Sequence, residues 1–345
     1  MKSPLVSLIL PTYNVEKFLK ECLESISNQT YGNIEIIVVI DGATDNSYDI
    51  AKTYADKDTR FKVFWQENAG SGPARNKGLS HASGELIMFV DPDDWIEPNM
   101  LEEYVKMYEQ YGSDLIITGY YEEYMTSEGV IRREKHLYNK EISTPSEVHS
   151  SYVSLFLDEA ICAPTRILYK KSIIVENHIS FPDLRRSQDI VFNYRYYNFA
   201  KSVLISEDIF YHYRIESAVY LQKYKVDYYK TLSLMYNEIL DLHRGWNIEI
   251  PKNEWVRFNN RFLVLIGYYI ESCLLQKNDY KPAMDDETLK TIAIESKPID
   301  FYHRRVRKAF LSHNKSNIEL IVGIKMFVRR HLHFVFECFR KVKKY

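Results

Sequence analysis

The sequence predicts an α/β protein in which a mostly parallel sheet carries helices on both faces. Short apolar runs alternate with amphipathic stretches over the first 120 residues. Polar loops follow several of these runs, at the sheet edge where ligands bind in such folds. Beyond residue 217 the signals are helical throughout. We therefore expect two regions, an α/β domain over residues 1–217 and a helical region over residues 218–345.

Each element of the α/β domain has its own local signal. The expected strands are residues 5–10, 34–40, 61–65, 86–90 and 115–118, and the expected helices are residues 15–28, 45–56, 72–82 and 98–111. The first helix places Leu19, Leu23 and Ile26 on one face at a 3.6-residue spacing. The last has Pro98 near its first turn, where proline needs no hydrogen-bond partner.

The pattern is less regular after residue 120. Strands with a turn at residues 127–129 are expected first, then helices at 146–158 and 188–199 and strands at 203–205 and 209–213. Helices are expected at residues 224–243, 253–276, 285–295 and 303–343. No internal repeat or low-complexity linker marks the boundary between the two regions.

Composition describes an ordinary globular chain with an uneven charge distribution. Of its 345 residues, 46% are hydrophobic and 27% are charged, which favours a packed core over disorder. The net charge of −2 combines +10 from residue 303 onward with −12 in the rest of the chain. Such asymmetry indicates a basic tail with an anionic partner.

Cysteine usage and hydropathy bear on the compartment. Four scattered cysteines, at positions 22, 162, 273 and 338, form no CxxC-type motif and fit reduced thiols in a cytosolic protein. The N-terminus leads directly into a strand-like run, so we expect no signal peptide. No apolar stretch approaches the roughly 20 residues that span a bilayer.

The most informative feature is an acidic cluster, DPDDW at residues 91–95, directly after the expected strand 86–90. Proline ends the strand, so three carboxylates are delivered together at the sheet edge. Clustered carboxylates repel one another, and a hard divalent cation removes that repulsion. The cluster thus suggests a metal–diphosphate site, although the same residues also make a good turn.

Four segments in this order carry a resemblance: VSLILPTYNVEKFLKECLESISNQTY, IEIIVVIDGATDNS, NAGSGPARNKGL and ELIMFVDPDDW. Together they resemble the family 2 glycosyltransferases, enzymes of the GT-A fold that use nucleotide sugars. The resemblance covers about the first 100 residues. It implies a metal-assisted transfer of a sugar from a UDP-sugar, with the metal stabilising the departing diphosphate.

The resemblance also implies roles for single residues. It places uracil and ribose at Pro11, Thr12, Tyr13 and Asp41, the nucleotide near Arg75, the ribose at Asp91, Mn²⁺ or Mg²⁺ at Asp93, and the donor sugar or the acceptor beside Asp94. In this family the general base comes later, in an acidic pair that opens a helix. Asp189 aligns with that base, whereas Gln188, which the resemblance places on the acceptor side, replaces the usual glutamate and cannot titrate. Without the family, Asp189 reads as an acid favoured by a helix N-terminus.

Two later segments complete the prediction. Residues 211–214 (YHYR) resemble a Tyr-x-Tyr-Arg stretch of the family, in which Arg214 would pair with diphosphate oxygens. For His212 we favour strand alternation over a role in binding. Residues 318–345 read as a basic amphipathic helix typical of a membrane-surface anchor, or as a helix packed on the domain. Nucleic acid is not expected, because no binding module accompanies the charge.

The prediction is an inverting, metal-dependent transfer of a hexose or N-acetylhexosamine from a UDP-sugar to a saccharide acceptor, expected to be lipid-linked. Similar bacterial enzymes build surface polysaccharides, so we expect a cytoplasmic protein at the inner face of the membrane. Two alternatives stay open. One is a catalytically inactive nucleotide-sugar-binding partner. The other is a haloacid-dehalogenase-type phosphatase, whose motif normally follows the first strand and has a small residue where Trp95 stands.

Overall fold

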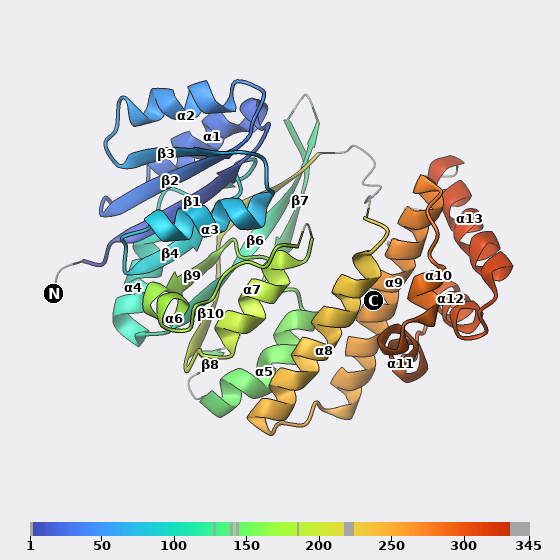
Figure 1. Cartoon of the computed structure of the whole chain (residues 1–345). Coiled ribbons are helices and arrows are strands. Elements are labelled where there is room, and N and C mark those ends of the chain that lie inside the picture. The colour runs from blue at the N-terminus through green and yellow to red at the C-terminus, as the bar shows by residue number, and fades with distance from the viewer. Residues whose placement is uncertain are drawn as a thin grey trace. The chain divides into compact units, whose positions relative to one another are not determined.

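The computed structural model describes residues 3–126, 129–138, 141–142, 145–184, 186–216 and 224–331 (Figure 1). The chain divides into two compact units, Met1–Ala218 and Val219–Tyr345. The expected boundary near residue 217 lies outside the described residues. The first unit holds the sheet and the second is helical.

The N-terminal half of the sheet is parallel, as expected. Its strands lie in the order β3-β2-β1-β4. These strands and the helices between them are β1 (Val6–Thr12), α1 (Glu16–Ser27), β2 (Ile34–Asp41), α2 (Ser47–Ala55), β3 (Phe61–Gln66), α3 (Ser71–His81) and β4 (Leu86–Phe89). Because β1, β2 and β4 run in one direction, the loops that follow them open at the same edge.

The other half makes the sheet mixed. Its strands are β5 (Trp95–Ile96), β6 (Leu115–Thr126), β7 (Gly129–His136), β8 (Glu141–Ile142), β9 (Ile167–Lys170) and β10 (Val203–Glu216). β9 is inserted antiparallel between β4 and β6. β10 then pairs parallel with β6 and antiparallel with β5. β9 is not among the expected strands, because a four-residue apolar run is ambiguous without its neighbours.

β10 also differs from its prediction. We expect two short strands, whereas one strand runs through, with register irregularities between Ile205 and Tyr211. These irregularities coincide with the predicted gap, where Ser206 and Asp208 hydrogen-bond to each other instead of joining a regular ladder. β10 pairs with β5 through Tyr211 and His212. Residues 211–214 therefore lie next to the segment that directly follows the acidic cluster.

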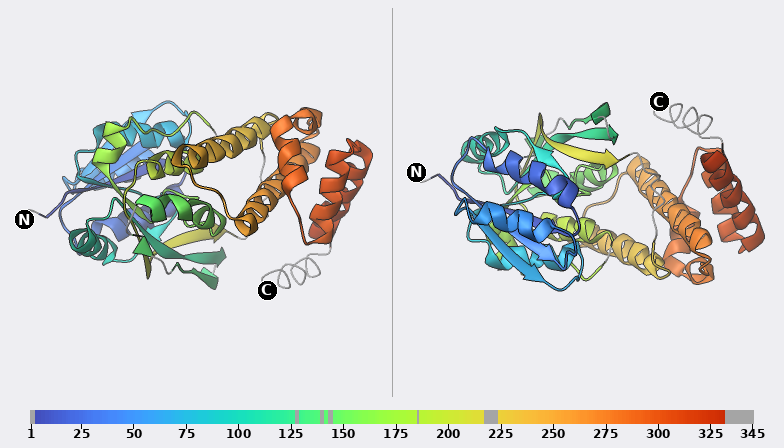
Figure 2. Two further views of the ribbon diagram at one scale, coloured as in Figure 1. Left: turned by 90° about the horizontal axis from the view of Figure 1, so that it is seen from below. Right: turned by 90° about the horizontal axis from the view of Figure 1, so that it is seen from above.

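Helices cover both faces of this sheet (Figures 1 and 2). The remaining ones in the first unit are α4 (Met100–Tyr111), α5 (Pro145–Leu157), α6 (Lys171–Glu176) and α7 (Gln188–Tyr197). α1 and α4 share one buried apolar cluster with the even-numbered residues of β1. On the other face, α3 packs Gly78 against Ile9, and α7 packs Phe192 edge-on against Phe89 at 5.6 Å. α3 and α7 therefore meet the sheet on the same side.

The second unit consists of α8 (Tyr228–Trp246), α9 (Lys252–Gln276), α10 (Lys281–Asp285), α11 (Glu287–Glu295), α12 (Phe301–Leu311) and α13 (Lys315–His331). Aromatic packing joins α8 to α9, where the ring of Tyr236 meets Phe258 at 5.4 Å and Phe262 at 5.3 Å. The single helix expected over residues 303–343 is instead broken between α12 and α13. His313, which has φ = +50°, lies in that break.

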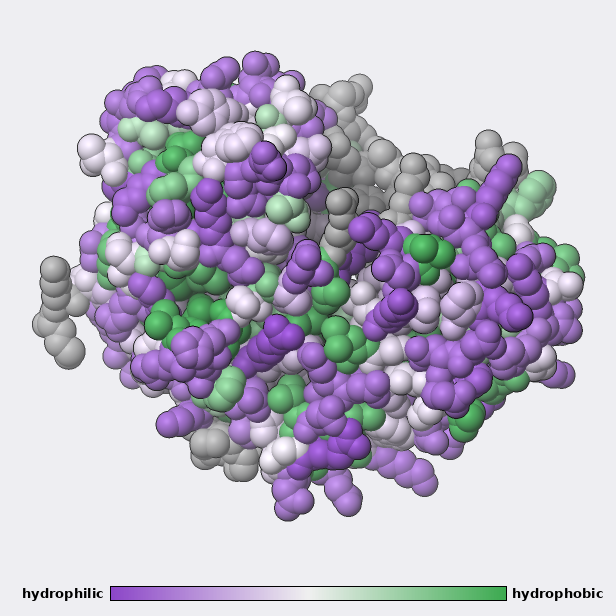
Figure 3. Space-filling model, in the orientation of Figure 1, coloured by the Kyte–Doolittle hydropathy of each residue, from purple (hydrophilic) through white to green (hydrophobic). Residues whose placement is uncertain are grey.

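The described part of the predicted tail packs on its own unit. Ile318 and Val322 of α13 are fully buried, and Lys325 pairs at 3.0 Å with Glu271 of α9. Residues 332–345 lie outside the described residues. Within the described residues, every helix is too short or too polar to cross a bilayer. On the face shown in Figure 3, hydrophilic residues predominate and hydrophobic residues form small separate patches.

Candidate functional site

Loops at the carboxyl edge of the parallel strands are tied together by side chains. Asn14, after β1, accepts a 2.8 Å hydrogen bond from the backbone N–H of Thr44, after β2. Asp45 accepts hydrogen bonds from the N–H groups of Glu16 (2.9 Å) and Ser47 (3.0 Å), at the starts of α1 and α2. These bonds lower the pKa of Asp45, although burial acts in the opposite direction. These side chains thus fix the two loops relative to each other.

Asp41 organises the glycine-rich loop. Its carboxylate accepts hydrogen bonds from the Gln66 side chain (2.7 Å) and from the N–H groups of Ala69 (2.9 Å) and Gly70 (2.8 Å). Gly42 follows with φ = +67°, and a Cβ there would lie 2.6 Å from the Asn68 nitrogen. Glycine is therefore needed at position 42. Asp41 is only 2% exposed, so its first role in this structure is to hold residues 66–70.

The three residues predicted beside Asp41 differ in exposure. Pro11 and Thr12 are buried within β1, and Tyr13 is 48% exposed at its end. Of this segment, the ring of Tyr13 is therefore the part that a ligand can reach directly.

Arg75 joins two acids that lie far apart in sequence. Its guanidinium forms ion pairs with Asp91 after β4 (2.8 Å) and with Asp189 in the first turn of α7 (2.6 Å). The Arg75 side chain is 4% exposed, whereas the two carboxylates are about one-third exposed, at 30% and 31%. The guanidinium therefore lies behind the acids. Its Nε is buried without a hydrogen-bond partner among the described residues, a cost typical of functional sites.

The charges in this cluster perturb one another. Burial raises the pKa of Asp189, an effect that Arg75 opposes and Asp91 reinforces. Although burial acts to lower the pKa of Arg75, the charges of Asp189 and Asp91 raise it above its ordinary value. Asp189 is thus a carboxylate with raised basicity, which remains paired with a cation.

Asp93 and Asp94 occupy different environments. Burial and the charge of Asp91 raise the pKa of Asp93 to about 6. No ion pair to the Asp93 side chain occurs among the described residues. Asp94 is 1% exposed and accepts hydrogen bonds from the Tyr211 hydroxyl (2.7 Å) and the Arg214 N–H (2.8 Å). Burial, followed by the charges of Asp93 and Asp91, raises the pKa of Asp94 well above its ordinary value. Asp94 thus anchors the acidic loop to β10.

Arg214 also holds the acidic loop. Its Nε donates to the backbone carbonyl of Asp93 at 2.7 Å, and its Nη2 pairs with Glu21 of α1 at 2.5 Å. The guanidinium lies over the rings of Phe18 and Trp95, each 4.7 Å from the ring centroid. The side chain is 5% exposed. In this structure Arg214 therefore positions residues 93–95, and its predicted contact with diphosphate stays a prediction.

His212 does more than alternate along a strand. Its two ring nitrogens lie 2.7 Å from Glu123 and 2.9 Å from Glu97. The ring also stacks on Trp95, with centroids 4.8 Å apart. His212 therefore links β10, β6 and the segment after the acidic cluster. Neither glutamate is predicted from the sequence, because neither belongs to a local motif.

Gln188 packs against the start of α3. Its side-chain amide donates to the hydroxyl of Ser71. A Cβ on Gly72 would lie 2.4 Å from the Gln188 carbonyl oxygen, so glycine leaves room for this contact. Gln188 is 4% exposed. It fixes α7 to α3, the helix that carries Arg75, and its predicted place beside the acceptor stays a prediction.

Comparison with known proteins places this arrangement in a family. Over 228 residues the chain is 39% identical to EpsH of Bacillus subtilis. The matched segment covers 65% of this chain and 65% of EpsH. It is 34% identical over 228 residues to the glycosyltransferase GlyG of Streptococcus pneumoniae. This match covers 62% of the chain and 72% of GlyG. The glycosyl transferase family 2 model matches residues 7–176. The chain belongs to glycosyltransferase family 2.

Solved structures support the GT-A fold for this family 2 chain. Residues 1–349 of Staphylococcus aureus TarS, in complex with UDP-GlcNAc, superpose with a TM-score of 0.65 at 21% identity. The match covers 94% of this chain and 91% of that one. The mannosyltransferase PcManGT of Pyrobaculum calidifontis, in complex with GDP-Man and Mn²⁺, gives a TM-score of 0.53 at 14% identity. This match covers 94% of the present chain and 87% of PcManGT. The predicted α/β fold with a helical extension is confirmed.

Family membership separates the matched part of the site from the rest. Asp41, Arg75 and the acidic cluster lie inside residues 7–176, whereas Asp189 and Arg214 lie beyond them. Arg75 is what brings Asp189 to the matched part. Membership in a glycosyltransferase family also argues against the phosphatase alternative.

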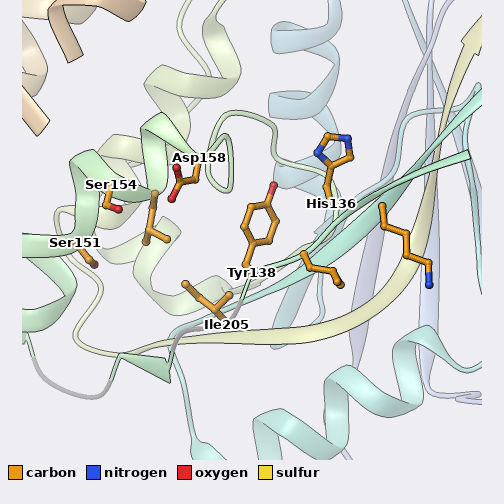
Figure 4. A pocket seen from close by; sticks show the side chains of 9 residues that line it. His136, Tyr138, Ser151, Ser154, Asp158 and Ile205 are labelled. Atoms are coloured by element: carbon orange, nitrogen blue, oxygen red, sulfur yellow. The ribbon is translucent and has the colours of Figure 1, made fainter. Parts of the chain in front are cut away.

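A hollow of about 520 Å³, which Arg75 does not line, lies between β7 and α5 (Figure 4). Tyr138 lies in its middle, with Asp158 and Ser154 on one side and His136 on the other. Near it, Glu122, Glu134 and His136 place one ligand atom each within 4.8 Å of one another. The group lies on the β6–β7 hairpin, where Glu122 also accepts from Tyr124 at 2.9 Å and Glu134 pairs with Arg132 at 3.4 Å. Both carboxylates therefore already have partners within the hairpin.

Proposed function

We propose that the chain catalyses an inverting, metal-dependent transfer of a hexose or N-acetylhexosamine from a UDP-sugar to a saccharide acceptor. The observation that carries this proposal is the Arg75 bridge between Asp91 and Asp189. It joins the acidic loop, where family resemblance places the donor, to the residue aligned with the family's base. Membership in family 2 and the UDP-GlcNAc complex of TarS support a UDP-sugar as donor.

Asp189 suits the role of general base. A base must be ionised in the resting enzyme and gain affinity for the proton as the acceptor attacks. Burial raises the pKa of Asp189, and Arg75 opposes part of that rise. About one-third of the side chain is exposed, which leaves room for an acceptor hydroxyl on the side away from Arg75. Asp91, on the other arm of Arg75, would lie toward the ribose.

Asp93 is the residue best suited to hold a divalent cation. A carboxylate whose pKa is raised to about 6 by burial and by Asp91 gains from a cation beside it. Hard cations such as Mn²⁺ or Mg²⁺ prefer such oxygen ligands. When bound, the cation would stabilise the charge of the departing diphosphate. The Mn²⁺ complex of PcManGT supports a metal in this fold. Arg214 would keep Asp93 in place through its carbonyl.

The test is UDP release from a panel of UDP-sugars, with Mn²⁺, Mg²⁺ or EDTA, and with lipid-linked saccharides from a bacterial host as acceptors. We expect release with one UDP-sugar, dependent on both metal and acceptor. UDP binding without release from any sugar would favour the inactive binding partner. Failure to bind UDP would overturn the donor-site assignment.

The acceptor is proposed to be lipid-linked, in surface polysaccharide synthesis at the inner face of the membrane. Support comes from the basic residues Arg340, Lys341, Lys343 and Lys344, each worth about 1 kcal/mol near anionic lipid. Because Ile318 and Val322 are buried, a truncation at residue 318 would expose the core of the second unit. Deletion of residues 332–345 is the cleaner test. We expect less pelleting with anionic vesicles and unchanged melting; unchanged pelleting would refute this role.

A further inference from the structure

The second unit contains a basic hollow that the transfer reaction does not use. It has a volume of about 790 Å³ and lies between the end of α11 and one face of α12. Four of its lining residues are cationic: Lys297, Arg304, Arg307 and Lys308. Among the described residues, none that lines it carries a carboxylate. All of these lining residues belong to the second unit, so the hollow lies within that unit.

The spacing of the cations on α12 explains why they converge. Arg304, Arg307, Lys308 and Leu311 are separated by three, one and three residues, and thus share one helix face. Lys297 approaches from the segment between the helices, next to Pro298. Like charges four residues apart on a helix repel one another, so the pair Arg304 and Lys308 disfavours the empty state. An anion in the hollow would relieve that repulsion.

Arg307 is held in place by the protein itself. Its Nε donates to the carbonyl of Ala293 at 2.6 Å, and its Nη2 donates to the carbonyl of Ile294 at 3.0 Å. These carbonyls belong to the last turn of α11, which lacks helical partners for such groups. The charge of Arg307 therefore compensates the partial negative charge at the C-terminus of α11. The positive charges of the other three cations are not compensated by that helix end.

Nearby acids are engaged elsewhere. Glu295 accepts a 3.0 Å hydrogen bond from the indole of Trp255. Asp300 caps α12 through the N–H of His303 and also contacts its ring at 2.7 Å. Within the described part of the chain, no ion pair to Lys297, Arg304 or Lys308 is found. The positive charge of the hollow is therefore available to a ligand.

We propose that this hollow binds a phosphate group, as a monoester or a diester. Phosphate suits several converging ammonium and guanidinium donors, and arginine can contact two of its oxygens at once. The apolar surroundings favour an anionic lipid headgroup as its source. Ile299 is 90% exposed and Phe301 is 66% exposed, directly after the lining residues 296–298. A soluble phosphate gains nothing from exposed apolar side chains beside it, whereas a bilayer surface can bury them.

The test compares two variants of the full chain that change charge equally. R304E/K308E reverses two exposed cations in the hollow. K230E/K252E reverses two exposed cations of the same unit outside it. Binding is measured by co-sedimentation with vesicles of phosphatidylcholine, alone or with phosphatidylglycerol, and by calorimetry with inorganic phosphate and pyrophosphate. Any binding of the soluble probes at the donor site is common to both variants and cancels in the comparison.

We expect R304E/K308E to bind phosphatidylglycerol vesicles at least about tenfold more weakly than K230E/K252E does. A selective loss with the soluble probes alone would support the phosphate site and assign it to a soluble ligand. Equal binding by the two variants, with vesicles and with soluble probes, would overturn the proposal. R304Q/K308Q serves as a milder variant should the charge reversal reduce stability. Since only binding is measured, the result does not depend on the proposed transfer reaction.

Discussion

The two units use buried charge differently. In the first, Arg75, Asp94 and Arg214 are almost fully buried, and each joins segments far apart in sequence. In the second, the contact between α8 and α9 is aromatic, with Tyr236 against Phe258 and Phe262. Burying charge costs free energy unless it is fully paired, whereas apolar packing stabilises directly. In the first unit a ligand can therefore relieve a cost of buried charge, whereas in the second the repulsion that a ligand can relieve is between exposed cations of the hollow.

The largest expected effect tests whether that buried charge serves catalysis. We expect Asp189→Asn to lower turnover about 10²- to 10⁴-fold, the usual contribution of a general base. Asparagine can still accept a hydrogen bond from Arg75, so the fold and UDP binding should persist. The measurement is metal-dependent UDP release, together with the melting temperature.

Asp183→Asn is the matched control, because Asp183 is an exposed acid shortly before α7. We expect near-native turnover from it. If Asp189→Asn is folded and equally active, Asp189 is not the base and its pairing with Arg75 is structural.

The next effect concerns pH. Burial and Asp91 raise the pKa of Asp93 to about 6, above its ordinary value of 3.8. Between these two values the folded state holds a proton that the unfolded state has lost. Stability therefore falls as the pH rises through this window, and the cost is fully present above about pH 6.

Asp93→Asn should remove that cost. We expect the metal-free variant to be more stable than the parent by about 1–3 kcal/mol at pH 7, with the difference gone near pH 4. Mn²⁺ should raise the melting temperature of the parent but not of the variant. Denaturant unfolding at several pH values measures both effects. A variant that Mn²⁺ stabilises as much as the parent would remove Asp93 from the metal site.

Local patterns were enough to predict the parallel half of the sheet and its helices. The strand expected at residues 34–40 is β2, Ile34–Asp41, and the helix expected at 72–82 is α3, Ser71–His81. Periodicity and turn chemistry act over short distances, so such elements can be read from the chain. β9 was missed because its four residues become a strand only between two partners that the chain supplies elsewhere.

The same distinction applies to the site. The acidic cluster was visible because its residues are adjacent in sequence, and family resemblance located Asp189. The contacts of Arg75 with Asp91 and Asp189 were not predictable, since they span 16 and 114 positions. The burial of Asp94 by Tyr211 and Arg214 was not predictable either, because it depends on where β10 lies in the sheet. Sequence thus identified the residue types, and the fold determined which of them meet.

An effect of similar size tests how tightly the first unit is packed. A Cβ on Gly78 would lie 2.3 Å from Cγ2 of Ile9, on the face of the sheet that α3 covers. We expect Gly78→Ala to destabilise the protein by about 1–3 kcal/mol, because α3 must shift away from β1. Such a shift would also move Arg75, which lies on the same helix. Turnover should therefore fall along with the denaturation midpoint; an unchanged midpoint would show that α3 has room to adjust.

The smallest effect is the same substitution in the second unit, where it should have the opposite sign. Gly245 lies within α8, and a Cβ there would meet no atom within 4 Å. Alanine loses less conformational entropy than glycine when a helix forms. We expect Gly245→Ala to stabilise the protein by about 0.5–1 kcal/mol without a change in turnover. Denaturant unfolding of the two variants side by side measures the contrast. Destabilisation by both would mean that the second unit is packed as tightly around α8 as the first is around α3.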